Sequence, residues 1–343
     1  MLVILADDLT GTLDSAAPFA GRGLITEVAL HPDALDEALA QAPEVVAINL
    51  RSREITALEA ANATANVLKR LPADMRIFKK VDSRLKGNIV AELDAMPFER
   101  ALVAPAIPDF GRVVVGGHVR GFGIETPIAV AAKLGGHAAR AHIPDTSSQD
   151  EMLASLQFAQ KEGFDLLVGA RGLADALAHS MTSKEPQPLM RLPEAPTLIV
   201  VGSRDPITVK QVDELRSHCA VEYYAAPAGV CDASPAQTRE MLTVVQATEG
   251  PAPVQSVEVS ANLATMVVPA FTDRASTLVL TGGATAEAVL EKMGVLRFRL
   301  LGECMPGMGL AIADGRHIIT KSGGFGQPDT LQRLARQILR KAA

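Results

Sequence analysis

The sequence of 343 residues contains no tryptophan, and aromatic residues make up only 3% of it. Single-stranded nucleic acids stack their bases on aromatic side chains, so this sequence offers little from which to build such a surface. The formal net charge of −6 and a pI near 5.7 also argue against a general polyanion binder. We therefore expect no nucleic-acid partner.

Cysteine is scarce as well, with three residues, Cys219, Cys231 and Cys304. Their spacing matches no metal-binding pair and their number is odd, which fits a reducing compartment better than a disulfide framework. The chain begins on an apolar stretch without a basic segment before it, and no apolar run approaches the ~20 residues of a membrane span. We expect a cytoplasmic protein with no membrane partner.

Several nucleotide-binding and catalytic motifs are also missing. The sequence has no G-x-x-x-x-G-K-[ST] loop, no G-x-G-x-x-G fingerprint and no G-x-S-x-G elbow, and its His and Cys residues form no metal-binding pattern. These absences argue against a P-loop ATPase, a dinucleotide-dependent enzyme of the common type and a serine hydrolase. They leave the ligands of any metal unknown.

What the sequence does contain is an alternation of apolar runs and helical periodicity. Strands are expected at residues 2–5, 26–30, 45–50, 76–79, 101–104, 138–143 and 165–168, with helices between most of them. This order predicts an α/β fold with a largely parallel, doubly wound sheet flanked by helices. The loops after the strands at 2–5, 45–50 and 76–79 should then face one crevice.

The length exceeds what one hydrophobic core usually supports, so two domains are expected. Between Thr182 and Pro196 the composition changes to Ser, Lys, Glu, Gln and Pro, which is typical of a semi-rigid linker. We predict a first domain at residues 1–185, a linker at 186–196 and a second domain at 197–343. The second domain should be built like the first, with strands at 197–201, 277–280 and 318–319. One helix should follow the turn at 202–208 and run to about 218, one should open at 281–286 and run through 293, and one should begin at about 329.

A polar stretch at residues 79–88 follows the fourth predicted strand and is the strongest candidate for an anion site. It contains four cations, a carboxylate, a hydroxyl and an amide, namely Lys79, Lys80, Arg84, Lys86, Asp82, Ser83 and Asn88. Loops at the carboxyl ends of strands are where open α/β sheets bind ligands. The alternative for such a stretch is a solvated basic turn.

Two adjacent carboxylates, Asp7 and Asp8, follow the first predicted strand. In that position they can orient substrate hydroxyls, accept a proton or hold Mg²⁺. The alternative is that one of them caps the helix that follows. Both roles can coexist.

Three glycine-containing elements follow strands of the second domain. They are Gly202-Ser203 before a helix with Pro206 near its start, Gly282-Gly283-Ala284-Thr285 at the start of another helix, and Lys321-Ser322-Gly323-Gly324. Free backbone N–H groups at a helix start bind phosphate. Each element alone could be a plain turn, but three in one domain favour a polyphosphate ligand.

The sequence contains six motifs that occur in the same order in the four-carbon acid sugar kinases, and it resembles that family. The shared motifs are Asp7-Asp8-Leu9-Thr10-Gly11, Lys79-Lys80-Val81-Asp82-Ser83 with Gly87-Asn88, Gly169 with Gly172-Leu173-Ala174, Gly202-Ser203 with Pro206 and Thr208, Gly282-Gly283 with Thr285, and Lys321-Ser322-Gly323 with Phe325-Gly326. They span nearly the whole chain. Val81-Asp82-Ser83 followed by Arg84 is similar to the branch that acts on aldonates rather than the 3-oxo-tetronate branch.

The resemblance implies an ATP-dependent kinase, with Mg²⁺, that phosphorylates the 4-hydroxyl of a sugar acid such as threonate or erythronate. It places the active site in a cleft between a substrate domain and a nucleotide domain. It implies catalytic roles for Asp8 and Asp82, and sugar-acid contacts from Asp7, Lys80, Ser83, Arg84, Lys86 and Asn88. It implies nucleotide contacts from Ser203, Gly282, Gly283, Ala284, Thr285, Lys321, Ser322, Gly323 and Gly324.

Two features depart from the family pattern. Arg204-Asp205 stands where Cys-Ser is frequent, and Ala284 stands where an acidic residue is frequent. The alternative hypothesis is therefore a catalytically weak member that binds a sugar acid or nucleotide as a regulatory protein. The sequence leaves the sugar acid, its stereochemistry and the oligomeric state open, and a homodimer is compatible with it.

Overall fold

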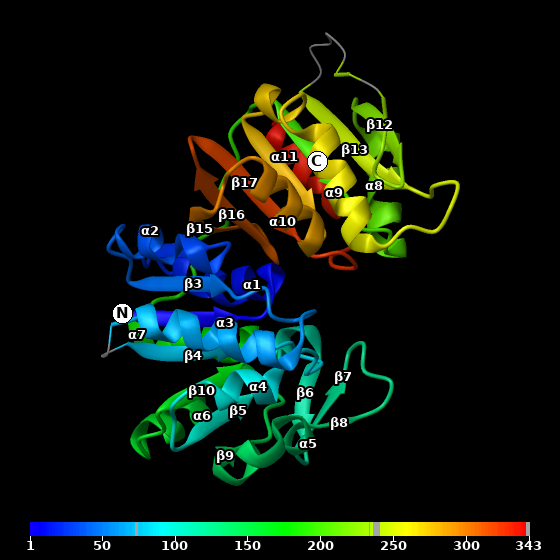
Figure 1. Cartoon of the computed structure of the whole chain (residues 1–343). Coiled ribbons are helices and arrows are strands. Elements are labelled where there is room, and N and C mark those ends of the chain that lie inside the picture. The colour runs from blue at the N-terminus through cyan, green and yellow to red at the C-terminus, as the bar shows by residue number, and fades with distance from the viewer. Residues whose placement is uncertain (73–74, 233, 236–240, 341–343) are drawn as a thin grey trace. The chain divides into compact units, whose positions relative to one another are not determined.

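The computed structural model describes residues 1–72, 75–232, 234–235 and 241–340. It divides into two compact units, Met1–Gln187 and Pro188–Ala343. The first runs from blue to green in Figure 1 and the second from green to red. Each unit has its own sheet and its own helices.

The main sheet of the first unit has the strand order β2-β3-β1-β4-β10-β5-β9, and all of its pairings are parallel. Its strands are β1 (Leu2–Ala6), β2 (Thr26–Ala29), β3 (Val45–Asn49), β4 (Arg76–Lys80), β5 (Ala101–Ala104), β9 (Ala141–His142) and β10 (Leu166–Gly169). β1 and β3 are buried along their whole length. Their largely apolar sequences, with Asn49 as the one polar residue, follow from this, because a parallel sheet is covered on both faces.

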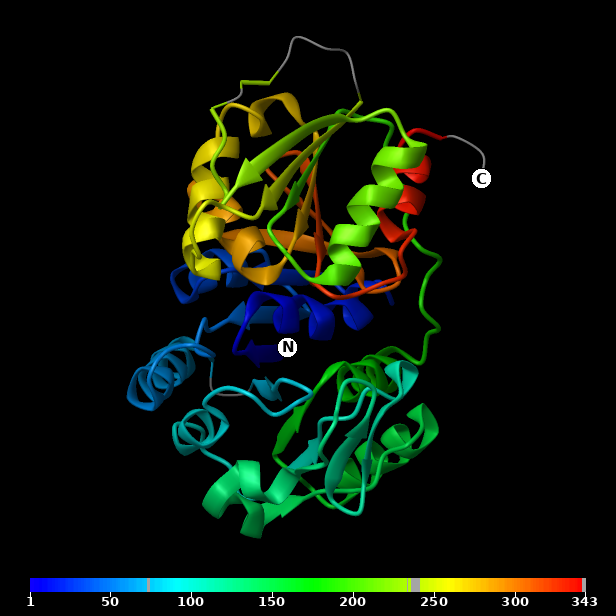
Figure 2. The same cartoon turned by 90° about the vertical axis from the view of Figure 1, so that its right-hand side faces the viewer.

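Helices cover both faces of this sheet, with α3 on one side and α6 and α7 on the other (Figure 2). The helices are α1 (Leu9–Ala20), α2 (Leu35–Leu39), α3 (Ala57–Arg70), α4 (Ile89–Asp94), α5 (Val130–Leu134), α6 (Gln149–Lys161) and α7 (Arg171–Thr182), with short 3₁₀ turns η1 (Pro32–Ala34), η2 (Pro108–Phe110) and η3 (Gly135–Arg140). Polar caps fix where several of them begin: Asp8 caps α1, Ser148 caps α6, and Thr56 with Glu59 forms a reciprocal capping box on α3. The predicted α/β architecture is confirmed.

A small antiparallel sheet, β6 (Arg112–Val115), β7 (His118–Gly121) and β8 (Ile128–Ala129), follows β5. Its first two strands form a hairpin, closed by Gly116 and Gly117 at positive φ. The predicted strand at 138–143 is largely wrong, because residues 138–140 belong to η3. There Arg140 stacks on Phe98, and His137 contacts Asp94, and these side-chain contacts accompany a turn rather than a strand.

The second unit contains a sheet in the order β12-β13-β11-β14-β17-β16-β15, parallel from β12 to β17 and antiparallel at β16 and β15. Its strands are β11 (Thr197–Val201), β12 (Glu222–Pro227), β13 (Leu242–Thr248), β14 (Thr277–Thr281), β15 (Arg297–Met305), β16 (Met308–Ala313) and β17 (Arg316–Lys321). Its helices are α8 (Pro206–His218), α9 (Ser256–Val267), α10 (Gly283–Lys292) and α11 (Thr330–Ile338), with the 3₁₀ turn η4 (Thr272–Arg274). α8 and α11 cover one face and α9 and α10 the other (Figure 2).

Strand order determines which loops become neighbours. In the first unit β3, β1 and β4 are adjacent, so the loops that follow them lie side by side at the carboxyl edge of the sheet, as predicted. In the second unit β11, β14 and β17 are adjacent, so the three glycine-containing loops also lie together. Both candidate sites are therefore formed at the edge where open α/β sheets bind ligands.

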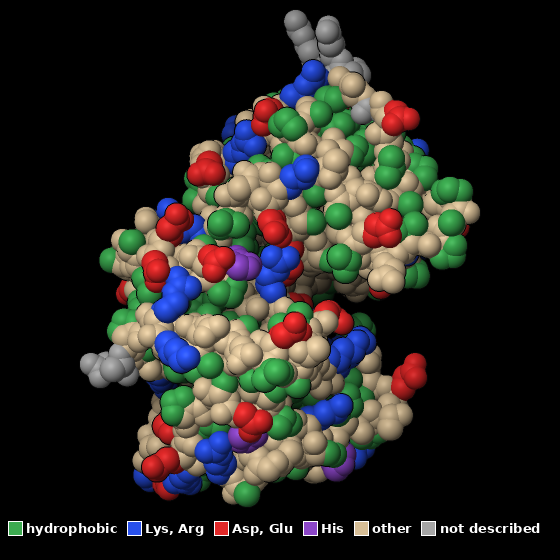
Figure 3. All heavy atoms as spheres, in the orientation of Figure 1, with side chains coloured by type: hydrophobic (Ala, Val, Ile, Leu, Met, Phe, Trp, Pro, Cys, Tyr) green, Lys and Arg blue, Asp and Glu red, His purple; other side chains and the backbone are tan. Residues whose placement is uncertain are grey.

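The surface charge, the cysteines and the lengths of the helices indicate no special class of protein. On the face in Figure 3, acidic and basic side chains are interspersed rather than gathered by sign. None of the three cysteines forms a disulfide, and burial raises the pKa of the Cys304 thiol to about 12. Within the described residues, no helix combines the length and the apolar character needed to cross a membrane.

A buried ion pair lies beneath the candidate site of the first unit. Lys79 Nζ is 2.9 Å from Glu92 Oε2, and the two side chains are 0% and 1% exposed. Ser52 Oγ donates a hydrogen bond of 2.5 Å to the other carboxylate oxygen of Glu92. Successive side chains of a strand point to opposite faces, so Lys79 turns away from the side where Lys80 lies. Lys79 therefore belongs to the core and not to an anion site.

Removing one partner of this pair should destabilise the fold strongly. We expect Lys79→Met to lower the free energy of unfolding by about 3–5 kcal/mol, because it leaves the Glu92 carboxylate buried without a counter-ion. The double variant Lys79→Met/Glu92→Leu should recover most of that loss. Thermal unfolding followed by circular dichroism measures both, with Lys69→Met, at an exposed lysine of α3, as the control. A single variant as stable as the Lys69 control would contradict a structural role for the pair.

Candidate active site

Arg53 joins the two carboxylates that follow β1. Its Nε and Nη2 donate to the two oxygens of Asp7 at 2.8 and 2.9 Å, and its Nη1 donates to Asp8 Oδ2 at 2.6 Å. Burial alone would raise the pKa of Asp7, but the hydrogen bonds from Arg53 and the charges of Lys80, Lys79 and Arg53 lower it overall. Asp7 is thus held as a buried carboxylate.

Asp8 is both the cap of α1 and part of this cluster. Its Oδ1 accepts a hydrogen bond from Gly11 N at 2.8 Å, and its Oδ2 accepts one from Thr10 Oγ1 at 2.7 Å besides that from Arg53. The capping alternative is therefore confirmed. Because both oxygens already accept hydrogen bonds, the arrangement suits orienting a substrate group more than taking up a proton.

Lys80, the last residue of β4, is a buried cation beside these carboxylates. It is 5% exposed, and no hydrogen bond or ion pair holds its ammonium group within the part of the chain that the structure describes. A Cβ atom on Gly11 would lie 2.6 Å from both Lys80 Nζ and Asp8 Oδ1. Glycine at this position therefore leaves room for the ammonium group and the carboxylate. Desolvating an ammonium group without a partner is costly, and an anionic ligand would relieve that cost.

The loop after β4 is organised by Asp82. Its Oδ2 accepts hydrogen bonds from the backbone N–H groups of Arg84 and Lys86 at 3.1 and 3.3 Å, while Leu85 takes a positive φ of 55°. Oδ1 of Asp82 has no hydrogen bond among the described residues, so it is open to a substrate hydroxyl. Lys86 is exposed, and its backbone N–H supports the turn.

Two other predicted contacts have partners within the protein. Asn88 donates from Nδ2 to the backbone carbonyls of Ser52 and Ile55, both at 2.8 Å, and so ties the loop after β4 to the loop after β3. Ser83 Oγ accepts a hydrogen bond of 2.5 Å from Arg112. The geometry gives Asn88 a role in the scaffold and leaves mainly its carbonyl oxygen for a ligand.

Arg53 and Arg112 are the residues of this cluster that sequence reasoning missed. Arg53 stands in an Arg-Ser-Arg sequence at the carboxyl end of a predicted strand, which was a usable signal. Arg112 follows a loop with two prolines and reaches the loop after β4 only through the fold. No pattern in the sequence indicates that contact.

The second unit contains a cavity of about 390 Å³ between the loops after β11 and β14. Six of the nine predicted nucleotide-binding residues line it: Ser203, Gly282, Gly283, Ala284, Thr285 and Gly323. Lys321, Ser322 and Gly324 do not line it: Lys321 ends β17, and Ser322 and Gly324 belong to the same loop as Gly323. From α9 it also includes Ser256, Val259 and Ser260, for which the sequence offered no motif.

Close packing at Gly202 and a free helix start shape this cavity. A Cβ on Gly202 would lie 1.8 Å from Thr285 Oγ1, so only glycine allows α10 to approach β11. Gly282 has a φ of 93° and provides no side chain to cap α10. The first N–H groups of α10 are therefore uncapped by a side chain at the cavity wall, which is the arrangement that binds phosphate.

The loop after β17 is held by hydrogen bonds from a side chain of α8. Gln211 Nε2 donates to the carbonyls of Phe325 and Gln327 at 3.0 and 2.8 Å. Lys321 is buried, and its Nζ donates to Ser322 O at 3.0 Å. Burial lowers the pKa of Lys321 to about 8, against the opposing charge of Asp205. Lys321 can therefore change its charge near neutral pH.

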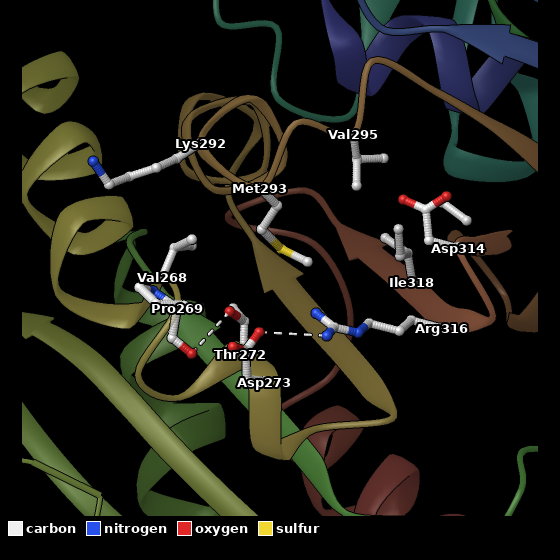
Figure 4. Close-up of a pocket in the computed structure, with 11 residues that line it drawn as sticks. Val268, Pro269, Thr272, Asp273, Lys292, Met293, Val295, Asp314, Arg316 and Ile318 are labelled. Carbon is white, nitrogen blue, oxygen red and sulfur yellow. Dashed lines mark hydrogen bonds and ion pairs between the residues drawn. The ribbon is translucent and has the colours of Figure 1, made fainter.

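A smaller cavity of about 290 Å³ lies at the other end of α10 (Figure 4). Gly283 at the start of α10 lines the first cavity and Lys292 at its end lines the second. Arg316 and Asp273 form an ion pair of 3.4 Å at its wall. No group of three or more His, Cys, Asp or Glu side chains able to hold a metal occurs within the described ranges.

Comparison with known proteins separates the same two regions. A family model for a sugar-binding N-terminal domain matches residues 2–123, and one for a nucleotide-binding C-terminal domain matches residues 198–331. A D-threonate kinase from Cupriavidus necator is 30% identical over 399 aligned positions, which cover 96% of each chain. A 3-oxo-tetronate kinase from the same organism is 25% identical and covers 98% of this chain and 97% of its own.

A solved structure from Salmonella typhimurium LT2, described as a tRNA synthase, has the same fold. Its TM-score is 0.76 at 18% sequence identity, and the match covers 98% of this chain and 99% of the other. At that identity the likeness concerns the fold alone.

Filling the space at Gly202 should change the cavity between the loops after β11 and β14, which is the candidate nucleotide site. We expect Gly202→Ala to weaken nucleotide affinity at least about tenfold, or about 1.4 kcal/mol, because the new Cβ displaces Thr285 and the start of α10. Isothermal titration calorimetry measures the affinity. Gly136→Ala is the control, since a Cβ there meets nothing within 4 Å. Equal affinities in the two variants would show that this cavity does not hold the nucleotide.

Nucleotide affinity should also depend on the charge of Lys321. Below pH 8 the ammonium form attracts phosphate, and as the pH rises through about 8 the free protein loses that charge, so affinity should fall between pH 7 and 9. Binding at pH 8 should take up protons, which titrations in buffers of different ionisation enthalpy detect. Lys321→Met should remove both effects. A pH dependence that persists in this variant would assign it to another group.

Proposed function

This chain belongs to the four-carbon acid sugar kinase family, and on that premise we propose that it transfers the terminal phosphoryl group of ATP to the 4-hydroxyl of a sugar acid such as D-threonate or erythronate. The observation that carries the proposal is the buried ammonium of Lys80, which lies beside the carboxylates of Asp7 and Asp8 and has no hydrogen bond or ion pair among the described residues. A hydroxy acid presents one anionic group and several hydroxyls. These side chains are complementary to both.

In the first unit, carboxylates would position the hydroxyls of the sugar acid. Oδ1 of Asp82 accepts no hydrogen bond from the described residues, and 21% of the Asp8 side chain is exposed. Arg53 offsets one of the two negative charges of Asp7 and Asp8 and so reduces their repulsion of an anionic substrate. Lys80 supplies the positive charge that attracts the substrate or the transferred phosphoryl group.

In the second unit, backbone N–H groups would hold the phosphates of ATP. The start of α10 at Gly283, the hydroxyls of Ser203 and Thr285, and Gly323 all line one cavity. The carboxylate of Asp205 at the same wall fits a Mg²⁺ ion bound mainly by phosphate oxygens and water. When bound, that ion would neutralise charge that develops on the phosphates.

In the transfer that we propose, the 4-hydroxyl oxygen forms a bond to the γ-phosphorus while the bond to the β–γ bridging oxygen breaks, leaving ADP. Asp82 would orient the hydroxyl and accept its proton. Phosphoryl transfer depends mainly on positioning and on charge neutralisation, so the cations and N–H groups carry most of the catalysis.

We propose an aldonate, rather than a 3-oxo acid, as the substrate, so that the product is an aldonate 4-phosphate. Arg84 follows Ser83 here, and its positive charge at the substrate loop suits an aldonate carboxylate. The whole-chain match to a D-threonate kinase is in line with this choice.

A regulatory protein without catalysis is the second candidate, because Arg204 and Ala284 line the cavity in place of the residues frequent in the family. An ADP-release assay with ATP and Mg²⁺ across D- and L-threonate, D- and L-erythronate and 3-oxo-tetronate separates the two. Turnover with one aldonate supports the kinase. Binding of ATP and a sugar acid without ADP release supports the regulatory protein.

Asp82→Asn tests the proposed base. The amide oxygen can still accept the hydrogen bonds from the backbone of Arg84 and Lys86, so the loop should keep its shape and the melting temperature should change little. We expect kcat to fall about 10²–10⁴-fold, the usual contribution of general base catalysis. Steady-state kinetics and a thermal melt give the two values. A variant that loses stability as much as activity would make Asp82 a structural residue.

A further inference from the structure

Arg112 is fixed above the substrate loop by hydrogen bonds of its guanidinium group. Its Nε and Nη2 donate to the carbonyl of Phe122 at 3.1 and 2.9 Å, and its Nη1 donates to Ser83 Oγ at 2.5 Å. Ser83 lies in the loop after β4, so Arg112 connects the small antiparallel sheet to the candidate site. Its position is preorganised by the protein and does not depend on a ligand.

The hairpin does not need Arg112 to close. Phe122 N donates to Gly111 O at 3.0 Å, and Ile124 N donates to Gly121 O at 2.9 Å, so backbone bonds already define the turn. The guanidinium contributes a further contact to a structure that is closed without it. Closure of the turn therefore does not by itself account for a charged group at this place.

Arg84 brings a second guanidinium to the same point. A Cβ atom on Gly123 would lie 2.7 Å from Arg84 Nη2 and 3.3 Å from Arg112 Nη2, so both groups meet beside this glycine. Neither arginine forms an ion pair with any residue in the described part of the chain. Burial and the like charge of Arg84 lower the pKa of Arg112, and only Asp82 opposes them.

Two guanidinium groups side by side without a carboxylate between them repel each other. The repulsion is relieved when an anion lies between them, and planar guanidinium groups bind carboxylates with two parallel hydrogen bonds. Both arginines are partly accessible, Arg84 on the surface and Arg112 half-buried, so a small anion can reach them.

We infer that Arg84 and Arg112 form a two-guanidinium subsite for the carboxylate of the sugar acid, and that this subsite selects acids over neutral polyols. The inference rests on the proposed function and assigns Arg112 a part in it. With the carboxylate held by this pair, Lys80 and the carboxylates beside it are left to act on the hydroxyl end. Val81–Arg84 then positions both ends of a short substrate from one loop.

The test compares binding of D-threonate with that of D-threonamide, in which a neutral amide replaces the carboxylate. Both are titrated into the full-length protein by calorimetry without nucleotide. We expect Arg112→Gln and Arg84→Gln each to weaken D-threonate binding at least about tenfold and to leave D-threonamide binding within about twofold. Arg112→Lys, which keeps the charge but loses the planar fork, should fall between wild type and Arg112→Gln.

Arg120→Gln is the matched control, because Arg120 is an exposed arginine of β7 in the same small sheet. It should leave both affinities unchanged. In kinetics with ATP, Arg112→Gln should act mainly by raising KM for the acid, with kcat changed less.

Three results would overturn the subsite. They are an equal loss of affinity for the acid and the amide in Arg112→Gln, D-threonate affinity that does not change, and wild-type protein that binds no sugar acid. Failure of the kinase proposal is a separate result: wild type that binds D-threonate but releases no ADP would refute the kinase, and the acid-over-amide loss in Arg112→Gln would still support the subsite.

Discussion

The contact of Arg53 with Asp7 and Asp8 is the interaction on which the candidate substrate site depends. Two carboxylates end β1 side by side, and without a cation between them they would repel each other and any acidic ligand. Arg53 comes from the loop after β3, the neighbouring strand, so the pairing follows from strand order. The order of the strands therefore places Arg53, together with the charge of Lys80, where it offsets the two carboxylates beside the candidate site.

Each unit places its candidate loops at the carboxyl edge of its own sheet, but the loops of the two units differ in kind. The first unit presents charged side chains on its loops, which suits a small ligand whose hydroxyls and carboxylate must each be recognised. The second presents glycines and the uncapped start of α10, so that backbone N–H groups face the cavity. Gly202 makes this approach feasible, since a single Cβ would collide with Thr285.

Sequence reasoning was accurate where local physics decides the outcome. Buried strands such as β1 and β3 are continuous apolar runs, and the glycine pair at Gly282 marks a helix start. It failed where side chains from distant elements decide. The full burial of Lys79 is made possible by its partner Glu92, which comes from α4. Where a strand was expected, η3 forms, with Arg140 stacked on Phe98 and His137 in contact with Asp94. Long-range contacts of that kind leave no periodic signal.

The balance of charge in the first unit favours an anionic ligand more than any single residue does. The cations around the candidate site are Arg53, Lys80, Arg84, Lys86 and Arg112, and the carboxylates are Asp7, Asp8 and Asp82. Arg53 is paired with Asp7 and Asp8, and Asp82 accepts hydrogen bonds from backbone N–H groups of its own loop. The other cations form no ion pair among the described residues. A hydroxy acid that meets a nucleotide polyphosphate needs such an excess, because both reactants are negative and their repulsion must be offset before a bond can form.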